Sequence, residues 1–592
     1  MAQTMAAGRR PVLGTAAMLA PILVLFLAAY VLPLGGLVAD SFQREGDFTF
    51  ANHTALLESR AFRIILWRTL TLSFVVTLIC LLIAYPLAYV LARLPSRWAA
   101  GLLLLVSVPY VTSILIRSYA WVVLLANNGV VNKLLLASGL VDEPLKLAFN
   151  ETGTYIGMVH VQLPLMVFPL YAAMHRIDRS LLAAARNLGS TAASAFWHIF
   201  LPLSLPGVAS GCTLVFLSCL GFYVTPALLG GPGQYMLAQG ITVRVLTLAD
   251  FAGAAAQATV LLLVVVLLFV ALRRRFAAGL GIESTGRSGR TTAARGLRAW
   301  PAPLEAAIEV LSGPLRALGS MLSIVGGPVV AVLAVLALLF LIVPLLMVIP
   351  LAFSDSPYLT FPPPGYSLRW FKTFLANARW LDAAGFSLGA AGIGAVVSLI
   401  VGIPAAFAVV RRPMMGRLPL YLLLISPLIV PHVIVALAMY FSMARVQLIG
   451  TPLAFVIAYA LIGAPYVFVL FVAGLLRFDR SLEMAAANLG ATPVTVLRTV
   501  TLPLLLPTLA AALLFAFIIG FDDVVFGLFL AGTNATPLPI RMWDDIRLEI
   551  SPQIAVVAVL LFAALALAYA AYLALGLLGD RRSRMPGGGP IA

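Results

Sequence analysis

Charged residues are scarce in this chain, since Asp, Glu, Lys and Arg make up 10% of its 592 residues while hydrophobic residues make up 62%. A soluble protein of this length needs more charge to cover its surface. Apolar runs of about 18 or more residues recur instead, each long enough to cross a hydrocarbon core of roughly 30 Å as a helix. The runs are continuous, which excludes the alternating pattern of a membrane β-barrel. The sequence therefore predicts an all-α polytopic membrane protein.

Cysteine, histidine and catalytic motifs are also sparse. Cys80, Cys212 and Cys219 fall inside apolar runs without metal-ligand spacing, so we interpret them as buried hydrophobic residues. The five histidines are scattered, and His160 and His432 are interpreted as packed neutral side chains. HExxH and CxxC motifs are absent, as is the phosphate-binding loop of an ATPase. We therefore expect no metal site, no cofactor and no enzyme activity in this chain.

Twelve membrane spans are predicted, in two sets of six. The first set lies near 12–39, 67–92, 100–126, 154–175, 204–230 and 253–272, and the second near 324–353, 384–410, 418–444, 453–476, 504–531 and 553–578. The first run is long for a signal peptide and is interpreted as a retained span. The predicted organisation is a first half (1–275), a basic linker (276–320) with an amphipathic segment near 304–318, and a second half (321–592).

The net charge of +16 reports topology rather than nucleic-acid binding, because the basic residues sit at the ends of the apolar runs. One side of a twelve-span arrangement collects Arg9, Arg10, Arg93, Arg97, the group from Arg176 to Arg186, Arg273–Arg275, Arg411, Arg412, Arg477, Arg480, Arg498, Arg581, Arg582 and Arg584. The other side holds Asp40, Glu45, Asp47, Asp142, Glu143, Asp355, Asp544 and Asp545. The positive-inside rule then predicts that both termini and the linker are cytoplasmic.

The two halves repeat a short pattern. Asp-Arg-Ser-Leu begins at Asp178 and again at Asp479, and Asn-Leu-Gly ends at Gly189 and again at Gly490, so both pairs have the same separation along the chain. Arg93 and Arg411, earlier in each half, are further apart than these pairs, which places extra residues of the first half between its third and fourth spans. Because the matching loops fall on the same side, the repeat is predicted to be parallel.

The repeated loop has its own predicted structure. Each copy reads as a short helix, a glycine that tolerates positive φ, and a second short helix before Leu-Pro opens the next span. The helices are predicted at 181–188 and 192–199 in the first half, and at 482–489 and 493–500 in the second. Their alanine-rich face permits close approach of another surface, so each loop is predicted to form a rigid projection into the cytoplasm.

The pattern Ala-Ala, three residues, Gly and later Leu-Pro resembles the EAA loop of ABC importer permeases. The resemblance implies a coupling helix that seats in a groove of an ATPase subunit, with two ATPase copies that bind the ATP and Mg²⁺. The residues it assigns to docking are Asp178, Ala184, Ala185, Gly189, Asp479, Glu483, Ala485, Ala486 and Gly490. The chain departs from the family pattern where an acid is expected, since Ala183 and Met484 stand there and Glu483 comes one position early.

Flanking motifs resemble the two permeases of spermidine/putrescine-type importers. The first half carries Ile116–Trp121, Asn127–Asn132 and Gly221–Leu228, and the second carries Gly520–Val525, Pro537–Ile540 and Ile550–Pro552. The resemblance implies a type I importer permease of the bacterial inner membrane with both permease subunits fused. It also implies an extracytoplasmic binding protein that delivers a polyamine or related amine.

Two neighbouring acids, Asp522 and Asp523, lie within a predicted span, where a carboxylate is costly unless it meets a polar cavity or a partner. They are candidates to contact an ammonium group, and Tyr110, Trp121, Phe222 and Tyr223 to add cation–π attraction, with Arg117 as a gate or ion-pair partner. Alternatively, one aspartate pairs with Arg117 or caps an unwound helix, and the aromatic residues serve packing. Amino-phosphonates or opines remain alternative solutes, and an ion-coupled secondary transporter an alternative class.

Overall fold

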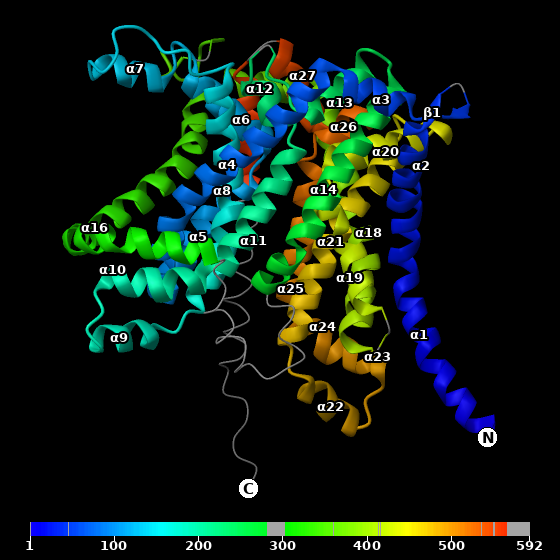
Figure 1. Ribbon diagram of the computed structural model, residues 1–592. Helices are drawn as coiled ribbons and strands as arrows, with labels where there is room; N and C mark the ends of the chain where they lie inside the picture. Colours follow the sequence, from blue (N-terminus) through cyan, green and yellow to red (C-terminus); the bar gives the residue numbers. More distant parts are fainter. Residues whose placement is uncertain are drawn as a thin grey trace, which may run out of the picture.

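The computed structural model of the protein describes residues 2–280 and 302–564, apart from 45, 232, 359, 413, 415, 534, 549 and 550. Figure 1 shows long helices that run between two ends of the molecule. Short helices and one small hairpin lie at one end, and the two repeated loops project from the other. We call these the outer end and the loop end.

The elements of the first half follow in chain order. They are α1 (Ala2–Phe26), η1 (Leu27–Val31), α2 (Leu32–Ser41), β1 (Gln43–Arg44), β2 (Asp47–Phe48), α3 (Ala51–Glu58), α4 (Arg60–Arg93), α5 (Ser96–Val111), α6 (Ile114–Leu125), α7 (Val130–Ala137), α8 (Glu151–His175), α9 (Arg179–Asn187), α10 (Ala192–Ala195), η2 (Phe196–Phe200), α11 (Leu201–Leu220), α12 (Val224–Leu229), α13 (Leu237–Leu246) and α14 (Phe251–Leu280). The strands β1 and β2 pair antiparallel, with Gln43 opposite Phe48.

The second half continues with α16 (Ala302–Ala352), α17 (Arg369–Ala376), α18 (Ala378–Arg411), α19 (Arg417–Ile425), η4 (Ser426–Leu428), α20 (His432–Arg445), α21 (Pro452–Arg477), α22 (Arg480–Asn488), α23 (Pro493–Val496), η5 (Leu497–Thr501), α24 (Leu502–Leu504), α25 (Leu506–Phe521), α26 (Val525–Leu530) and α27 (Leu538–Leu548). The amphipathic segment predicted near 304–318 is helical and continuous with the seventh span in α16. The rest of the linker, 281–301, lies outside the described residues.

The predicted spans agree with the structure. Among the described residues, nine helices are long and apolar enough to cross a membrane, or eleven if each of two bent helix pairs is one span. These eleven overlap the first eleven predicted spans. The twelfth begins as the helix Gln553–Ala564, and its remainder lies outside the described residues. Continuous helices satisfy their own backbone hydrogen bonds, as a hydrocarbon surrounding requires.

The repeat is confirmed element by element. Four helices of the first half recur in the second: α9 as α22, α10 as α23, α11 as the pair α24–α25, and α12 as α26. The first residues of each matched pair are as far apart along the chain as Asp178 and Asp479. The long helix α4 recurs as α18, at the wider separation of Arg93 from Arg411. Both loops lie at the same end of the molecule (Figure 1), so the repeat is parallel, as predicted.

The third and ninth spans are broken at equivalent positions. The third divides at Thr112 and Ser113, between α5 and α6, and the ninth divides before α20 with a bend of 92°. In the ninth span the break precedes Pro431, whose ring disfavours helical geometry in the residue before it. Each break exposes a helix start in the interior of the protein, where its free N–H groups need acceptors.

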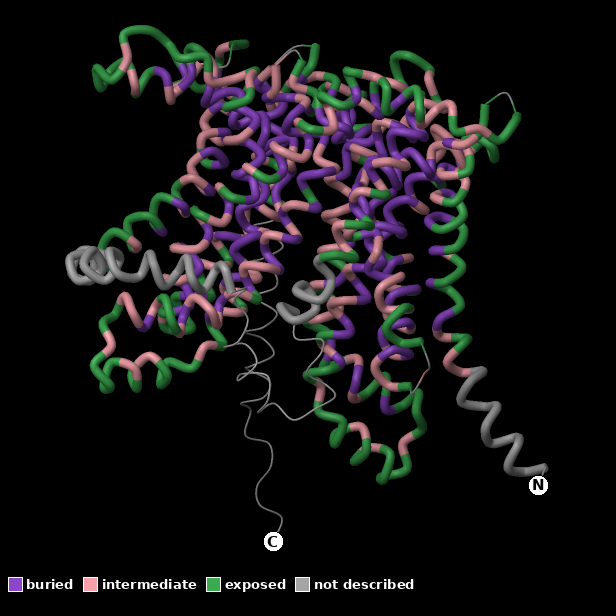
Figure 2. The backbone as a smooth tube through the Cα atoms, viewed as in Figure 1, coloured by how far each residue is buried: buried purple, intermediate pink, exposed green. Residues whose placement is uncertain are grey.

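The two halves interlock through their first spans. The helices α1 and α2 of the first half pack on α18 and α20 of the second, while α16 of the second half packs on α4, α5 and α6 of the first. Within the second half, α18 and α21 approach closely because Gly394 and Gly402 lack side chains; an added Cβ would lie 2.8 Å from Tyr459 and Val467 atoms respectively. Figure 2 shows that buried residues concentrate toward the outer end, whereas the projecting loops are largely exposed.

Candidate functional site

The paired loops share one local geometry. Each first helix begins at an aspartate whose carboxylate accepts a hydrogen bond from a backbone N–H two residues later: Asp178 from Ser180 and Asp479 from Ser481, both at 2.9 Å. These bonds lower the pKa of both aspartates below its ordinary value. A carboxylate at this position satisfies a free N–H and interacts favourably with the helix dipole.

Each loop helix ends at a glycine in the left-handed region, as predicted. The φ angle is +86° at Gly189 and +85° at Gly490. The carbonyl of Ala185 accepts from the N–H after Gly189, and the carbonyl of Ala486 accepts from the N–H after Gly490, at 3.0 and 3.1 Å. This left-handed ending turns the chain toward the second short helix and fixes the angle between the two helices.

Each loop exposes a large apolar side chain directly before its glycine. Leu188 and Leu489 are 88% and 89% exposed, and the alanines Ala184 and Ala485 are exposed one turn earlier. No residue of α9 or α22, both fully described, is buried. The sequence interpretation missed Leu188 and Leu489 as site residues, although the matched Asn-Leu-Gly triplets contain both. Exposed leucines at matching positions are candidates for a protein contact.

Glu483 faces the protein rather than the free surface of its loop. Its Oε1 lies 3.2 Å from Nη2 of Arg411 at the end of α18 and accepts a hydrogen bond from the Thr501 hydroxyl at 2.9 Å. The first half has Leu182 at the equivalent position, and there Arg179 donates to the Ala92 carbonyl at 2.8 Å. Both loops are therefore tied to the span that carries Arg93 or Arg411, one through an ion pair and the other through a backbone carbonyl.

The second candidate region lies where the halves cross in the interior. The carboxylate of Asp522, at the end of α25, accepts a hydrogen bond at 3.0 Å from the N–H of Ile114, which starts α6 in the other half. The equivalent residue of the first half is Gly221, and a Cβ there would collide with the ring of Pro431 at the break before α20. Each half thus places the end of one helix against the broken span of the other.

Asp523 is nearly buried, at 8% exposure, and caps a helix in its own half. Its Oδ1 accepts from the Phe526 N–H at 2.7 Å, at the start of α26. Its Oδ2 lies 3.8 Å from Nδ1 of His432, at the start of α20. The sequence interpretation treated His432 as a packed side chain; in the structure its side chain is 38% exposed and faces this carboxylate.

The remaining pathway candidates divide into two groups. Arg117 is 5% exposed and lies within electrostatic range of both Asp522 and Tyr110. Trp121 instead packs against His160 and Phe340, with ring centroids 5.7 and 5.3 Å away. The structure thus brings Tyr110, Arg117 and Asp522 together, whereas Trp121 belongs to the packing between α6 and α16.

Phe222 and Tyr223 follow Gly221 directly but have different surroundings. Phe222 packs against the core of the first half. Tyr223 stacks toward Trp543 of α27, with ring centroids 5.4 Å apart, so it joins the two halves. Packing, which the sequence left open as the alternative for each aromatic residue, therefore accounts for both rings.

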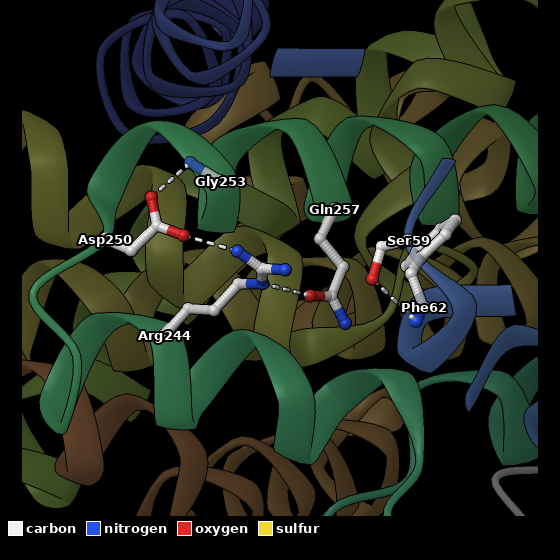
Figure 3. Close-up of polar contacts among 6 residues, drawn as sticks. All are labelled: Ser59, Phe62, Arg244, Asp250, Gly253 and Gln257. Atoms are coloured by element: carbon white, nitrogen blue, oxygen red, sulfur yellow. Dashed lines mark hydrogen bonds and ion pairs between the residues drawn. The ribbon is translucent and has the colours of Figure 1, made fainter. Parts of the chain in front are cut away.

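Polar contacts stiffen the outer end of the first half (Figure 3). Arg244 of α13 forms an ion pair with Asp250, and its Nε donates to Gln257 of α14 at 3.0 Å. Asp250 in turn accepts from the Gly253 N–H at 2.9 Å and caps α14. Beside this network, the Ser59 hydroxyl accepts from the Phe62 N–H and starts α4. The Arg244 contacts hold α13 against α14, whereas the Ser59 bond lies within the start of α4.

Known proteins resemble both halves of the chain. The family model described as "Binding-protein-dependent transport system inner membrane component" matches residues 60–281 and 398–584. The spermidine/putrescine transport system permease protein PotB of Escherichia coli (strain K12) is 37% identical over 214 residues, which cover 36% of this chain and 78% of the relative. The putrescine transport system permease protein PotI of the same strain is 32% identical over 250 residues, 41% of this chain and 89% of the relative.

A solved structure shows a more distant likeness. A chain of a bacterial alginate ABC transporter, in complex with an alginate pentasaccharide-bound periplasmic protein, matches with a TM-score of 0.39 and 22% sequence identity. The match covers 44% of this chain and 92% of that chain.

Proposed function

This chain belongs to the family of inner membrane components of binding-protein-dependent transport systems, and we propose that it forms the complete membrane pathway of an ATP-driven polyamine importer. Two copies of a separate ATPase dock on the two loops and bind the ATP and Mg²⁺. An extracytoplasmic binding protein delivers the solute to the outer end. Both termini and the linker lie in the cytoplasm, on the side of the loops.

The observation that carries the ATPase assignment is the pair of loops. They have matching caps, matching left-handed glycines and matching exposed leucines, all at one constant separation along the chain. Paired and similar surfaces at one end of a two-half chain suit two copies of one partner. In this proposal Leu188 and Leu489 insert into the ATPase groove, with Ala184 and Ala485 allowing close approach, and Glu483 holds its loop to α18 instead of touching the ATPase.

The docking proposal is tested with the double variant Leu188→Asp and Leu489→Asp. A charged group at a central interface position costs about 2 kcal/mol or more, so the affinity for the ATPase falls by about thirtyfold. Affinity is measured by titrating purified ATPase onto the full chain in nanodiscs. Leu140→Asp, at a leucine 74% exposed on the outer end, is the matched control and leaves the affinity unchanged. Equal ATPase affinity in the double variant and the control would remove these leucines from the docking surface.

The polyamine assignment rests on the crossing region and on the relatives named for putrescine and spermidine transport. Asp522 and Asp523 offer two carboxylates, and a polyamine carries ammonium groups that such acids attract. Tyr110, next to Arg117 and Asp522, offers a ring face for cation–π contact. Both carboxylates already accept backbone N–H bonds, so a passing cation competes with two helix caps.

This competition suggests how solute passage and gating are coupled. With the crossing contacts made, Asp522 ties the end of α25 to the start of α6, and the halves stay together near the outer end. Closure of the ATPases draws the two loops together and rotates the halves as rigid bodies, which pulls Asp522 away from Ile114. An ammonium group then replaces the lost N–H partner of the carboxylate and stabilises the separated state.

One observation favours a different solute. Arg117 is buried beside Asp522, and a guanidinium suits an anionic group such as that of an amino-phosphonate or an opine. Uptake into proteoliposomes that contain chain, ATPase and binding protein separates the two. Competition by putrescine and spermidine supports the polyamine proposal, whereas competition by amino-phosphonates alone replaces it. Uptake that persists without ATP and follows an ion gradient would instead indicate a secondary transporter.

A further inference from the structure

A cavity of about 370 Å³ opens beside the first turns of α4, at the outer end of the molecule. Its size falls within the range of roughly 300–1,000 Å³ that is usual for small-ligand sites. Three arginines line it, Arg60, Arg63 and Arg68, together with Trp67 of the same helix and Glu151 at the start of α8. It lies far along the chain from both regions described above and serves neither of them.

The cavity carries an excess of positive charge. Arg60 donates no hydrogen bond to any residue that the structure describes. Arg63 donates to two backbone carbonyls, those of Leu57 and Glu58, both at 3.0 Å, and Arg68 donates to the carbonyl of Gly233. Carbonyl oxygens do not neutralise a guanidinium, and each guanidinium has five N–H donors, so several remain for a ligand.

The one acid in the lining is already engaged. Oε1 of Glu151 accepts a hydrogen bond from the Tyr155 hydroxyl at 2.8 Å. A single carboxylate opposes three arginines, so the cavity attracts anions, and the nearby N-terminus of α4 adds to that attraction.

An apolar stripe continues from the cavity down the same helix. Trp67, Phe74, Leu78 and Leu82 lie along one side of α4, and they are 70%, 62%, 46% and 65% exposed. Because α4 is long and apolar enough to cross the membrane, this stripe faces lipid chains. Trp67, between the arginines and the stripe, occupies the place of an interfacial aromatic residue.

The fold does not require this cluster. When α4 is aligned with α18 through their matching last residues, Arg93 and Arg411, the second half has other side chains at the cluster positions. Those of Arg60, Arg63 and Arg68 are occupied by Ala378, Leu381 and Phe386. Arginines at the outer ends of spans also run against the usual charge bias of membrane proteins. At these aligned positions the first half has arginines and the second half does not, which points to a ligand of the first half.

We infer that this cavity binds the phosphate headgroup of an anionic phospholipid from the outer leaflet. Arg60, Arg63 and Arg68 hold the phosphate, Trp67 packs against the glycerol region, and an acyl chain lies along Phe74, Leu78 and Leu82. An acidic protein surface would match the arginines but not the exposed apolar stripe that continues from them, so the observations favour a lipid.

The test uses the full chain in nanodiscs made from equal parts of phosphatidylglycerol and phosphatidylcholine. Native mass spectrometry counts the phospholipid molecules that stay bound after release from the disc. We expect retained phosphatidylglycerol in preference to phosphatidylcholine. The triple variant Arg60→Gln, Arg63→Gln, Arg68→Gln should lower phosphatidylglycerol affinity by roughly fivefold for each arginine, which is the usual effect of one basic residue at an anionic membrane surface.

A matched control removes the same charge elsewhere. Arg369→Gln, Lys372→Gln and Arg379→Gln change three exposed residues at the outer end of the second half and should leave lipid retention unchanged. Because Arg63 and Arg68 also bond to the backbone, Arg60→Gln alone serves if the triple variant does not fold, with about fivefold weaker retention expected.

Three results would overturn the inference. Equal loss in the control triple variant would mean a general charge effect. Displacement of the bound lipid by excess inorganic phosphate, with phosphate itself retained, would mean a simple anion site. Unchanged lipid retention with weakened association of the binding protein would mean that the arginines dock a protein.

Discussion

Two substitutions of Asp522 separate its role as a hydrogen-bond acceptor for a helix start from its role as a charged group. Asp522→Ala removes the acceptor of the Ile114 N–H at the start of α6, where the Ser113 hydroxyl still accepts from the Leu115 N–H. Loss of a helix cap costs about 1 kcal/mol, and a charge-assisted bond is roughly twice as strong. The joined arrangement of the halves should therefore lose about 2 kcal/mol, a thirtyfold shift toward separation. Asp522→Asn keeps an amide oxygen in the same place, so it retains much of the cap while the charge is lost.

The two variants should differ in two assays of the assembled importer in nanodiscs. ATP hydrolysis without binding protein reports separation of the halves, because weakening the resting state raises the population of the active one. It should rise clearly in Asp522→Ala and little in Asp522→Asn. Solute uptake should fall in both if the carboxylate meets a cation. Asp47→Asn, at an exposed acid of β2, is the control. Equal basal hydrolysis in the alanine and wild-type proteins would refute the gating role, and full uptake by Asp522→Asn would refute the ammonium contact.

Four further outcomes are expected at the loops and the linker. A double-mutant cycle of Glu483→Gln and Arg411→Gln in thermal unfolding should give a coupling of about 0.5–1 kcal/mol, since the pair is only partly buried; additive effects would show that it contributes nothing. Gly490→Val should abolish uptake with normal membrane insertion, whereas Gly490→Asn, which tolerates positive φ, should retain part of it. The lowered pKa of Asp178 means that its cap stabilises the loop above the unfolded pKa of about 3.9 and is lost as pH falls below it. The protection factor of the loop amides, which is the intrinsic exchange rate divided by the observed rate, should therefore fall in acid, and Asp178→Asn should remove that change. A reporter inserted in 281–301 should register as cytoplasmic, and an external signal would contradict the proposed topology.

Local chemistry made the loops predictable. A glycine after a short alanine-rich helix needs only its neighbours to adopt a left-handed ending, and Gly189 and Gly490 do so at nearly the same φ. The number and approximate positions of the spans follow from apolar length, but the helices of the fifth and eleventh spans end at Leu220 and Phe521, earlier than the predicted 230 and 531. The break in the third span was not predicted, although Ser113, whose hydroxyl accepts from the Leu115 N–H, is a residue type that favours helix starts.

Contacts between distant segments account for what the sequence left open. The partner of Asp522 lies 408 residues away in the chain, so capping was one alternative among several. The side chain of Glu483 points toward Arg411, which α18 brings close to the loop. The sequence of α22 does not reveal this direction, because none of its nine residues is buried and no apolar face marks the side that contacts the protein. Trp121 turned out to pack against α16, the first helix of the other half, for the same reason.

The crossing also explains why the halves have to differ. Two copies of the first half would place Gly221 opposite the Ser113 break, and the start of α6 would lose its carboxylate cap. Two copies of the second half would place Asp522 opposite Pro431, where the ring leaves no room for a side chain beyond Gly. The pairs formed by Asp522 with Ile114 and by Gly221 with Pro431 are complementary only when one half of each kind is present. Fusion in one chain guarantees that ratio, so a single carboxylate at the crossing can serve both as a cap between halves and as a charge in the pathway.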